Sequence, residues 1–415
     1  MNLDHLVAQY EAYPYPARDP RDEAKRLITG SPSHLDEVNH YVFAGRLAHR
    51  QPLRVLVAGG GTGDGTIQIA QQMADAGNPG RVVYIDLSTT ARQVAEARAA
   101  ARGLSNIEFR TGSLLDPGDE IFDYIDCCGV LHHLPDPAAG LAALAARLAS
   151  SGGMGIMVYA PLGRTGVYPM QSALRALTQG LPAKEAVALA RRALAGLPKT
   201  NWLLNNPHIS DHRGPDADLY DLLLHSCDRP FTVPELAELA ASAGLAVSAL
   251  ISPAAYDPAT WIKDPRLLKR LEGMDFLAKA ALAEQLCGAM TKHVAYLARP
   301  ERQGDAQARP DGPDAVPVLR DIDGPALAKA LPPNGALEID LLGSAFPLAL
   351  PRLAGPILRH VDGAANLGLI HRRVADTVGG ELTWDSFKAQ FDRLYAALNG
   401  FGKMLLRRPP PQPAG

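Results

Sequence analysis

The sequence lacks a continuous apolar run long enough to cross a membrane, and it lacks a marked excess of charge of either sign. A spanning helix needs about 18–20 apolar residues, and no segment of the 415 residues reaches that length. The N-terminus, MNLDHLVAQYEAYPYPARDP, is polar and has no signal-peptide core. The formal net charge of −3 gives no general attraction to nucleic acid or anionic lipid. We therefore expect a globular protein that has no membrane partner and no nucleic-acid partner.

Cysteine is scarce, and its spacing excludes two classes of site. The four cysteines form no CxxC pair, and two of them are adjacent in an apolar run: Cys127, Cys128, Cys227 and Cys287. This spacing argues against structural zinc and favours reduced, buried thiols. We expect a cytoplasmic protein with no metal cofactor.

Apolar runs alternate with helical periodicity from residue 53 onward. Short buried strands are expected at 53–59, 81–87, 106–112, 122–130 and 154–160. Intervening helices are expected at 65–75, 89–102 and 138–149, the last ended by Ser151-Gly152-Gly153. This alternation predicts an α/β fold with a parallel, Rossmann-like sheet.

Two further strands, 245–252 and 293–299, would complete a seven-stranded domain over 51–300. Helical insertions are expected at about 161–230 and 253–292. Within the first, 169–179 and 183–196 have helical periodicity, and the segment 205–218 is polar. A further helix begins after Thr232, where Thr-Val-Pro-Glu forms a capping box. Residues 1–50 are expected to form a helical N-terminal lid.

The C-terminal part follows a polar linker, 300–316, that is rich in Pro, Gly and Asp. Beyond it we expect a compact α+β domain at 317–408 and a disordered tail at 409–415. Its last helix has one apolar face, made of Phe387, Phe391, Leu394, Tyr395 and Leu398. Three helices closed by a short strand resemble a winged-helix module. Because its charges are mixed, we expect substrate docking or a homodimer contact rather than DNA binding.

A glycine loop follows the first expected strand. Residues 55–66 read VLVAGGGTGDGT, and glycines at 59, 61 and 63 allow a ligand to approach the backbone next to a helix N-terminus. Asp86 ends the second strand, where an acid can bind the ribose hydroxyls of an adenosine. This pair is compatible with NAD, with S-adenosylmethionine (AdoMet), or with a plain turn.

Later motifs separate these readings. Thr111-Gly112-Ser113-Leu114-Leu115-Asp116 follows the third strand, and Gly129-Val130-Leu131-His132-His133-Leu134 follows the fourth. Together with the glycine loop and Asp86, in this order, they resemble the successive motifs of class I AdoMet-dependent methyltransferases over residues 50–300.

The resemblance implies a role for eight residues. Gly59, Gly61 and Gly63 would line the methionine part, Asp86 would bind the ribose, Leu87, Ser113 and Leu114 would contact the adenine, and Gly129 would lie beside the sulfonium. Two positions depart from the family's pattern. Val57 replaces an acid, and Ser113 replaces an Asp. The amino-acid end of the cofactor is therefore the least secure part of the assignment.

Candidate residues for the methyl acceptor lie on loops after the strands. A general base is needed only for a protonated acceptor, and His132, His133 and His208 are the candidates. Substrate contacts are expected from Tyr13, Tyr15, Arg164, Tyr168 and His212. A structural role is the alternative for each: packing under the cofactor for the histidine pair, docking of the insertion for Arg164 and Tyr168, an extended anchor for Tyr13 and Tyr15, and a solvated loop for His208 and His212. The spacing of His208, Asp211 and His212 could also gather metal ligands, but two histidines and one acid within a loop make a weak site.

The leading hypothesis is an AdoMet-dependent methyltransferase that releases S-adenosylhomocysteine (AdoHcy). Its acceptor would be an N or O nucleophile, such as a protein lysine. A small metabolite is the alternative acceptor, and an AdoMet-binding regulator without turnover is the alternative of another class.

Overall fold

The computed structural model describes residues 11, 14–49, 52–333, 335–379 and 381–409. The chain forms two compact units. Unit 1 contains residues 1–34, 52–245 and 287–294, and unit 2 contains residues 35–51, 246–286 and 295–415. These boundaries differ from the expected ones, because residues 35–51 and 246–286 fold with the C-terminal part of the chain.

The central sheet has seven strands in the order β3-β2-β1-β4-β5-β7-β6. The strands are β1 (Arg54–Ala58), β2 (Arg81–Asp86), β3 (Ile107–Thr111), β4 (Phe122–Cys128), β5 (Leu148–Tyr159), β6 (Ala246–Ile251) and β7 (Lys292–Ala298). Strands β1 to β5 pair in parallel. The predicted Rossmann-like α/β fold is therefore confirmed, and the sheet has the methyltransferase strand order.

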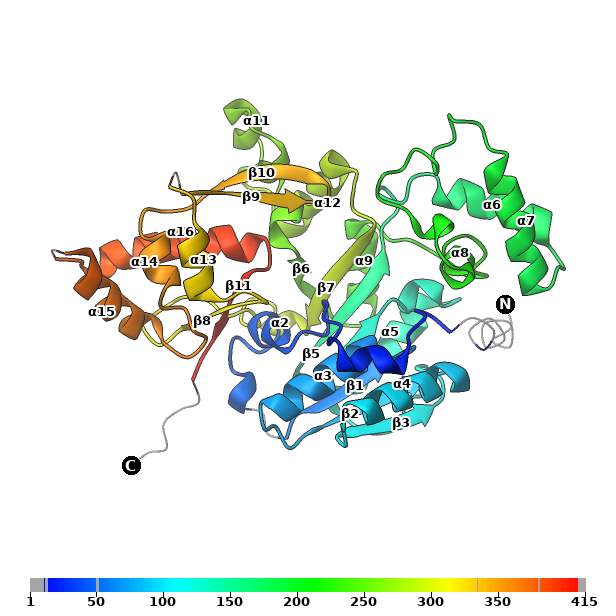
Figure 1. Ribbon diagram of the computed structural model, residues 1–415, viewed down its shortest axis with the longest axis horizontal. Helices are drawn as coiled ribbons and strands as arrows, with labels where there is room; N and C mark the ends of the chain where they lie inside the picture. The colour runs from blue at the N-terminus through cyan, green and yellow to red at the C-terminus, as the bar shows by residue number, and fades with distance from the viewer. Residues whose placement is uncertain (1–10, 12–13, 50–51, 334, 380, 410–415) are drawn as a thin grey trace. The chain divides into compact units, whose positions relative to one another are not determined.

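Helices of unit 1 flank the first five strands (Figure 1). They are η1 (Pro20–Ala24), α3 (Asp64–Asp75), α4 (Thr89–Ala101), η3 (Leu131–His133), α5 (Pro137–Ala145) and α9 (Val233–Ser242). Helix α4 packs against α3 and η1, and α5 packs against α9. The predicted capping box at Thr232 is confirmed, because its side chain accepts from Glu235 N and the Glu235 side chain accepts from Thr232 N.

One helix boundary was wrong. The expected helix 138–149 ends at Ala145, and β5 begins at Leu148, so Ser151-Gly152-Gly153 lies inside a strand. Leu148 pairs with Phe122, and the register shifts before Gly153 pairs with Tyr124. A Cβ at Gly152 would lie 2.6 Å from Asp123 O. The glycine therefore permits a close strand approach as well as marking a boundary.

The first insertion forms a small helical cluster in unit 1. It contains α6 (Val167–Thr178), α7 (Ala183–Ala195), η4 (Asp211–Arg213) and α8 (Asp216–Leu223). Buried leucines such as Leu174, Leu203, Leu219 and Leu222 form its core. The polar segment 205–218 obscured α8 in the sequence, because the first turn of that helix carries Asp216 and Asp218.

Unit 2 is built from short helices and two small antiparallel sheets. Its remaining elements are α2 (Leu35–Tyr41), η2 (Leu47–His49), η5 (Pro253–Tyr256), α10 (Pro258–Trp261), α11 (Pro265–Lys269), α12 (Phe276–Cys287), η6 (Pro300–Arg302), β8 (Val316–Leu319), α13 (Gly324–Ala330), β9 (Ala336–Leu341), β10 (Ser344–Ala349), α14 (Ala354–Leu358), α15 (Leu367–Val378), α16 (Trp384–Gly400) and β11 (Met404–Arg407). Strand β8 pairs with β11, and β9 with β10.

The predicted apolar face of α16 is confirmed. Phe387, Phe391 and Leu394 are fully buried in the core of unit 2, with Tyr395 packed against them. Strand β10, which pairs with β9 ahead of helices α14 to α16, was not expected, whereas a strand at 336–342 was. The winged-helix character of this module stays a prediction.

Two segments belong to unit 2 although the sequence predicted a lid and a linker for them. His40 on α2 accepts a hydrogen bond from Leu406 N at 3.0 Å, so part of the expected N-terminal lid packs on β11. The expected linker is partly buried: Ala306 O accepts from Ala44 N, and Ala308 N donates to His40 O. These backbone contacts are non-local, so local composition did not predict them.

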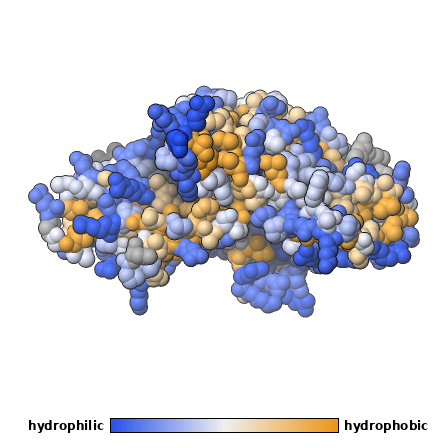
Figure 2. Space-filling model, turned by 90° about the horizontal axis from the view of Figure 1, so that it is seen from above, coloured by the Kyte–Doolittle hydropathy of each residue, from blue (hydrophilic) through white to orange (hydrophobic). Residues whose placement is uncertain are grey.

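The surface mixes hydrophilic and apolar residues on the face shown in Figure 2. Trp202 and Leu177, which are 66% and 57% exposed, are the most exposed large apolar side chains in the described part of the chain. None of the described helices is long and apolar enough to cross a membrane.

Candidate functional site

The glycine loop is compressed between strand β2 and the N-terminal segment. Gly59 N and Gly60 N both donate to Ile85 O, at 2.8 and 3.2 Å. A Cβ at Gly60 would lie 2.3 Å from the Tyr84 ring, and a Cβ at Gly61 would lie 2.9 Å from Tyr15 O. Side chains at these positions would therefore push the loop away from its neighbours.

Asp86 links this loop to the end of β2. Its two carboxylate oxygens accept from Gly61 N and Ser88 N, each at 2.8 Å. Burial raises the pKa of Asp86, although these backbone donors oppose the shift. Each oxygen keeps a second lone pair, so the carboxylate can still accept from the two hydroxyls of a ribose.

A cavity of about 750 Å³ lies above the carboxyl ends of β1 to β5. Seven of the eight residues predicted to bind the cofactor line it: Gly59, Gly61, Asp86, Leu87, Ser113, Leu114 and Gly129. The predicted positions thus meet in one cavity, with the adenine candidates in the loops after β2 and β3 and the sulfonium candidate directly after β4. This volume falls within the usual range for small-molecule sites.

Gly63 is outside the lining, so the role assigned to it is not supported by the cavity. It is the N-cap of α3 with a φ of 101°. A Cβ there would lie 2.8 Å from the Ala95 Cβ. The glycine is therefore needed for the left-handed turn and for the close approach of α3 to α4.

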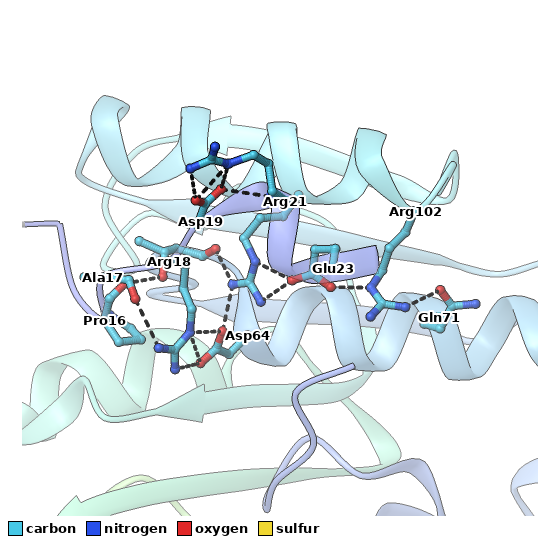
Figure 3. Close-up of polar contacts among 11 residues, drawn as sticks. Pro16, Ala17, Arg18, Asp19, Arg21, Glu23, Asp64, Gln71 and Arg102 are labelled. Carbon is cyan, nitrogen blue, oxygen red and sulfur yellow. Dashed lines mark hydrogen bonds and ion pairs between the residues drawn. The ribbon is translucent and has the colours of Figure 1, made fainter. Parts of the chain in front are cut away.

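The N-terminal segment 14–24 lies over the glycine loop. Tyr15 and Pro16 line the cavity, and Pro16 O accepts from the Thr62 hydroxyl at 2.7 Å. Arg18 forms a bidentate contact with Asp64, the first residue of α3, at 2.7 and 2.9 Å (Figure 3). Among the described residues of the expected lid, the cavity is lined by Tyr15 and Pro16 and by residues between Ile28 and Ser33. Tyr13, predicted to contact substrate, lies outside the described residues.

A buried ion-pair network fastens the same segment to α4. Arg98, whose side chain is 1% exposed, pairs with Glu23 at 2.6 Å and with Asp64 at 2.7 Å. It also donates to Thr62 O at 2.8 Å. Arg102 pairs with the other oxygen of Glu23 (Figure 3). This network holds segment 14–24, the glycine loop and α4 together.

A second group of polar residues lies at the β4–β5 end of the cavity. His133 Nδ1 donates to Cys227 O at 2.8 Å, which leaves Nε2 as the acceptor nitrogen, 3.9 Å from an Asp221 oxygen. The Tyr159 hydroxyl donates to the other Asp221 oxygen at 3.1 Å. Burial raises the pKa of Asp221, and His133 and Tyr159 oppose that shift. His133, Tyr159 and Asp221 all line the cavity.

Arg164 lies beside this group, and its positive charge is compensated by an ion pair. Its guanidinium carbon is 3.7 Å from the centre of the Tyr159 ring, and it pairs with the buried Asp228 at 3.3 Å. Arg164 and His208 both line the cavity, and their roles toward a substrate stay predictions. Tyr168 is outside the lining; its hydroxyl accepts from Arg164 at 3.1 Å. It therefore positions the arginine in this structure.

The structure places two histidine candidates away from the cavity. His132 is fully buried between His133 and Tyr159, at ring distances of 4.2 and 4.0 Å. His212 lines a separate small pocket and accepts from Arg213 at 3.2 Å. Burial lowers the pKa of both side chains. Their predicted base and substrate roles have no support from this geometry.

Several lining residues were missed from the sequence: Ser33, Gln68, Asp126, Asp221 and Lys292. Three residues, His133, Asp221 and His225, hold possible ligand atoms within 4.8 Å of one another in the described part of the chain. This cluster differs from the 208–212 segment that had been weighed as a metal site: His133 ends η3 after β4, Asp221 lies on α8, and His225 follows α8. No spacing motif could have revealed it.

The cavity fits AdoMet by the chemistry of its lining. Asp86 offers acceptors for a ribose, and the loop glycines leave room for the backbone to contact a ligand. Among the described residues, Asp126 Oδ1 and Gln68 Nε2 are buried polar atoms that have no hydrogen-bond partner. An acceptor and a donor of this kind suit the charged amino-acid end of AdoMet.

Known proteins share parts of this architecture. A family model of the methyltransferase domain matches residues 56–154. An uncharacterized protein of Synechococcus sp. is 37% identical over 211 residues, which are 48% of this chain and 47% of that protein. A ubiquinone biosynthesis O-methyltransferase of Alkalilimnicola ehrlichii is 34% identical over 153 residues, 36% of this chain and 57% of the enzyme. The chain thus spans about half the length of the curated relatives it matches.

Among solved structures, PKMT2 from Rickettsia typhi has a TM-score of 0.64 and 15% sequence identity, covering 92% of this chain and 77% of that one. Its complex with AdoHcy has a TM-score of 0.59. This likeness concerns the fold alone. Together with the family-model match, it shows that the chain contains a methyltransferase domain with the fold of AdoMet-dependent methyltransferases.

Proposed function

We propose that this protein transfers the methyl group of AdoMet to an amine, such as the side chain of a protein lysine. When bound, AdoMet supplies an electrophilic methyl group on a sulfonium. The observation that carries the proposal is the set of carboxylates at the β4–β5 end of the cavity, with His133 beside them.

Acidic residues at this end favour a cationic acceptor. Asp211 and Asp221 line the cavity. Burial raises the pKa of the Tyr15 hydroxyl, and the negative charges of Asp221, Asp211 and Asp218 raise it further. A field that opposes a phenolate attracts an ammonium group. Because Arg164 is paired with Asp228, it does not cancel this field.

An ammonium group must lose a proton before its nitrogen can attack. His133 Nε2 is the acceptor nitrogen of the ring, because Nδ1 donates to Cys227 O. Asp221, 3.9 Å away, would stabilise the imidazolium that forms. The segment 14–24 covers the glycine loop and would exclude water from this end, since Tyr15 lines the cavity. Positioning supplies most of the remaining rate enhancement of such a displacement.

A methyl-label experiment tests the proposal. Purified protein is incubated with a cell lysate and AdoMet tritiated on the methyl group, and the products are separated by size. Label in a protein band, stable to mild base as an N-methyl group is, supports the proposal. Label confined to small molecules would favour a metabolite acceptor, and AdoMet binding without any transfer would favour a regulator. Asp86→Ala is the control, because it should abolish labelling.

The C-terminal module and the assembly state are further parts of the proposal. We propose that residues 317–408 dock the acceptor or form a homodimer. The mixed charges of α16 favour this over DNA binding, because Lys388 pairs with Asp392 at 2.7 Å. Sedimentation velocity of the full chain with and without AdoHcy distinguishes a monomer from a homodimer. The four free cysteines support a reducing compartment such as the cytoplasm.

A further inference from the structure

The first motif of this chain lacks its acid, and the structure brings another carboxylate to the same level of the sheet. Val57 stands two residues before Gly59, where the family's pattern has an acidic residue. On the neighbouring strand β4, Asp126 is the register partner of Val57. Both residues line the cavity. We propose that Asp126 binds the α-ammonium group of AdoMet and AdoHcy and so replaces the missing acid; this inference rests on the proposed function.

Asp126 has one oxygen available for such a contact. Its side chain is 1% exposed, and Oδ2 accepts from the Ser33 hydroxyl at 2.6 Å. Oδ1 is buried and has no hydrogen-bond partner among the described residues. Burial raises the pKa of Asp126 to about 7, with only the Ser33 hydrogen bond opposing the shift. A buried carboxylate with an unpaired oxygen is unfavourable by itself and is stabilised by a cation.

A complementary donor lies in the same cavity. Gln68 Oε1 accepts from Gly30 N at 2.9 Å, which fixes the orientation of the amide. Its Nε2 is buried and has no partner in the described part of the chain. It can therefore donate to the carboxylate of a zwitterionic amino acid, and the Lys292 ammonium lines the same cavity. One free acceptor and one free donor match the two ends of that zwitterion.

The glycine at the start of α3 leaves room for this subsite. A Cβ at Gly65 would lie 2.6 Å from the Ser33 hydroxyl and 3.7 Å from Asp126 Oδ2. The helix N-terminus can therefore approach the pair closely.

The other carboxylates on this side of the cavity are already engaged. Asp64 pairs with Arg18 and Arg98 at 2.7 Å each, and both Asp86 oxygens accept from backbone N–H groups. Asp136 caps α5 by accepting from Ala139 N at 3.0 Å. Asp126 thus differs from these three in having a buried oxygen without a hydrogen-bond partner among the described residues.

Two ligands separate binding of the amino-acid end from binding of the nucleoside. AdoHcy carries the ammonium and carboxylate, whereas 5′-methylthioadenosine shares the adenosine and the thioether sulfur but lacks the amino acid. Calorimetry would measure both dissociation constants for the full chain. Asp126→Asn should weaken AdoHcy binding 10- to 100-fold and leave methylthioadenosine binding within twofold.

Two control variants show whether a loss of affinity is specific to the amino-acid end of the ligand. Asp86→Ala should weaken both ligands, because both carry the ribose. Asp119→Asn, which removes an exposed carboxylate paired with Arg147, should change neither. Unchanged AdoHcy affinity in Asp126→Asn, or an equal loss for both ligands, would overturn the role of Asp126 while the methyltransferase proposal stands. If the wild-type protein binds neither ligand, the methyltransferase proposal itself fails.

A second measurement needs no variant. As the pH falls from 7.5 to 5.5, Asp126 becomes protonated, so AdoHcy affinity should fall relative to methylthioadenosine affinity. The charge of Asp126 acts on the adjacent thiols of Cys127 and Cys128, and Lys292 and Asp64 act on the Cys128 thiol as well. Burial raises the pKa of Cys128 to about 12, whereas Arg18 and Arg98 outweigh burial and lower that of Asp64, so neither titrates in this range. A ratio of affinities that is independent of pH would contradict the proposal.

Discussion

Glu23 is the residue at which the ion-pair network over the glycine loop can be tested most directly. Its side chain is 3% exposed and faces two guanidinium groups, those of Arg98 and Arg102. Glu23→Gln keeps the shape of the side chain and removes its charge. The two arginines would then share a buried region in which Asp64 remains as the charged partner of Arg98.

The expected loss of stability in Glu23→Gln depends on the contacts that Arg98 keeps. Removing one partner of a buried ion pair costs about 3–5 kcal/mol. Arg98 would keep its contacts to Asp64, at 2.7 Å, and to Thr62 O, at 2.8 Å. We therefore expect a loss of about 2–3 kcal/mol in the free energy of unfolding, at or just below the lower limit of that range. For a domain of 150–250 residues this corresponds to a fall of about 4–12 °C in Tm.

Thermal unfolding followed by circular dichroism measures this shift. Asp22→Asn is the matched control in the same 3-10 helix, because Asp22 pairs with Lys25 on the surface, where the two side chains are 60% and 76% exposed. It should leave Tm unchanged. In the double variant Glu23→Gln/Arg98→Met, the loss should be smaller than the sum of the two single losses, since both charges are removed. A Glu23→Gln protein as stable as the wild type would refute the reasoning.

Three further predictions concern the cavity. Gly60→Ala would place a Cβ 2.3 Å from the Tyr84 ring and should cost about 1–3 kcal/mol in chemical denaturation, whereas Gly304→Ala, which has open space around it, should cost much less. His133→Gln should lower the rate of methyl transfer at least 100-fold while the AdoHcy dissociation constant stays within a fewfold; an unchanged rate would exclude His133 as the base. The pKa of Asp126 in the folded protein, about 7, lies above its value near 3.9 in an unfolded chain, so the carboxyl contributes stability below pH 4 that is lost as the pH rises to about 7, by up to about 4 kcal/mol. Without ligand, Asp126→Asn should therefore lose less stability than the wild type between pH 4 and 7, and equal slopes in urea unfolding would contradict the assigned pKa.

Local sequence was sufficient for the elements that position the cofactor. The apolar run before Gly59, the helix after it and the acid at the end of β2 each depend on neighbouring residues, and β1, α3 and Asp86 lie where they were predicted. The capping box at Thr232 also forms as predicted. The same holds for the apolar face of α16, because Phe387, Phe391 and Leu394, which define its periodicity, are buried.

Residues distant in the chain required the tertiary structure. Asp126 is next to Val57 only because β4 pairs with β1, and Glu23 reaches Arg98 across 75 positions. Likewise, α2 packs against β11, which lies near the other end of the chain. Hydrophobic periodicity and helix caps reflect short-range backbone preferences. The sequence by itself therefore determined which strands and helices follow one another along the chain, and it determined the glycine loop and the acid expected to bind the ribose. The order of the strands within the sheet and the burial of charged side chains depend on long-range packing. Only the tertiary structure therefore decided which carboxylates share the cavity and which histidine faces it.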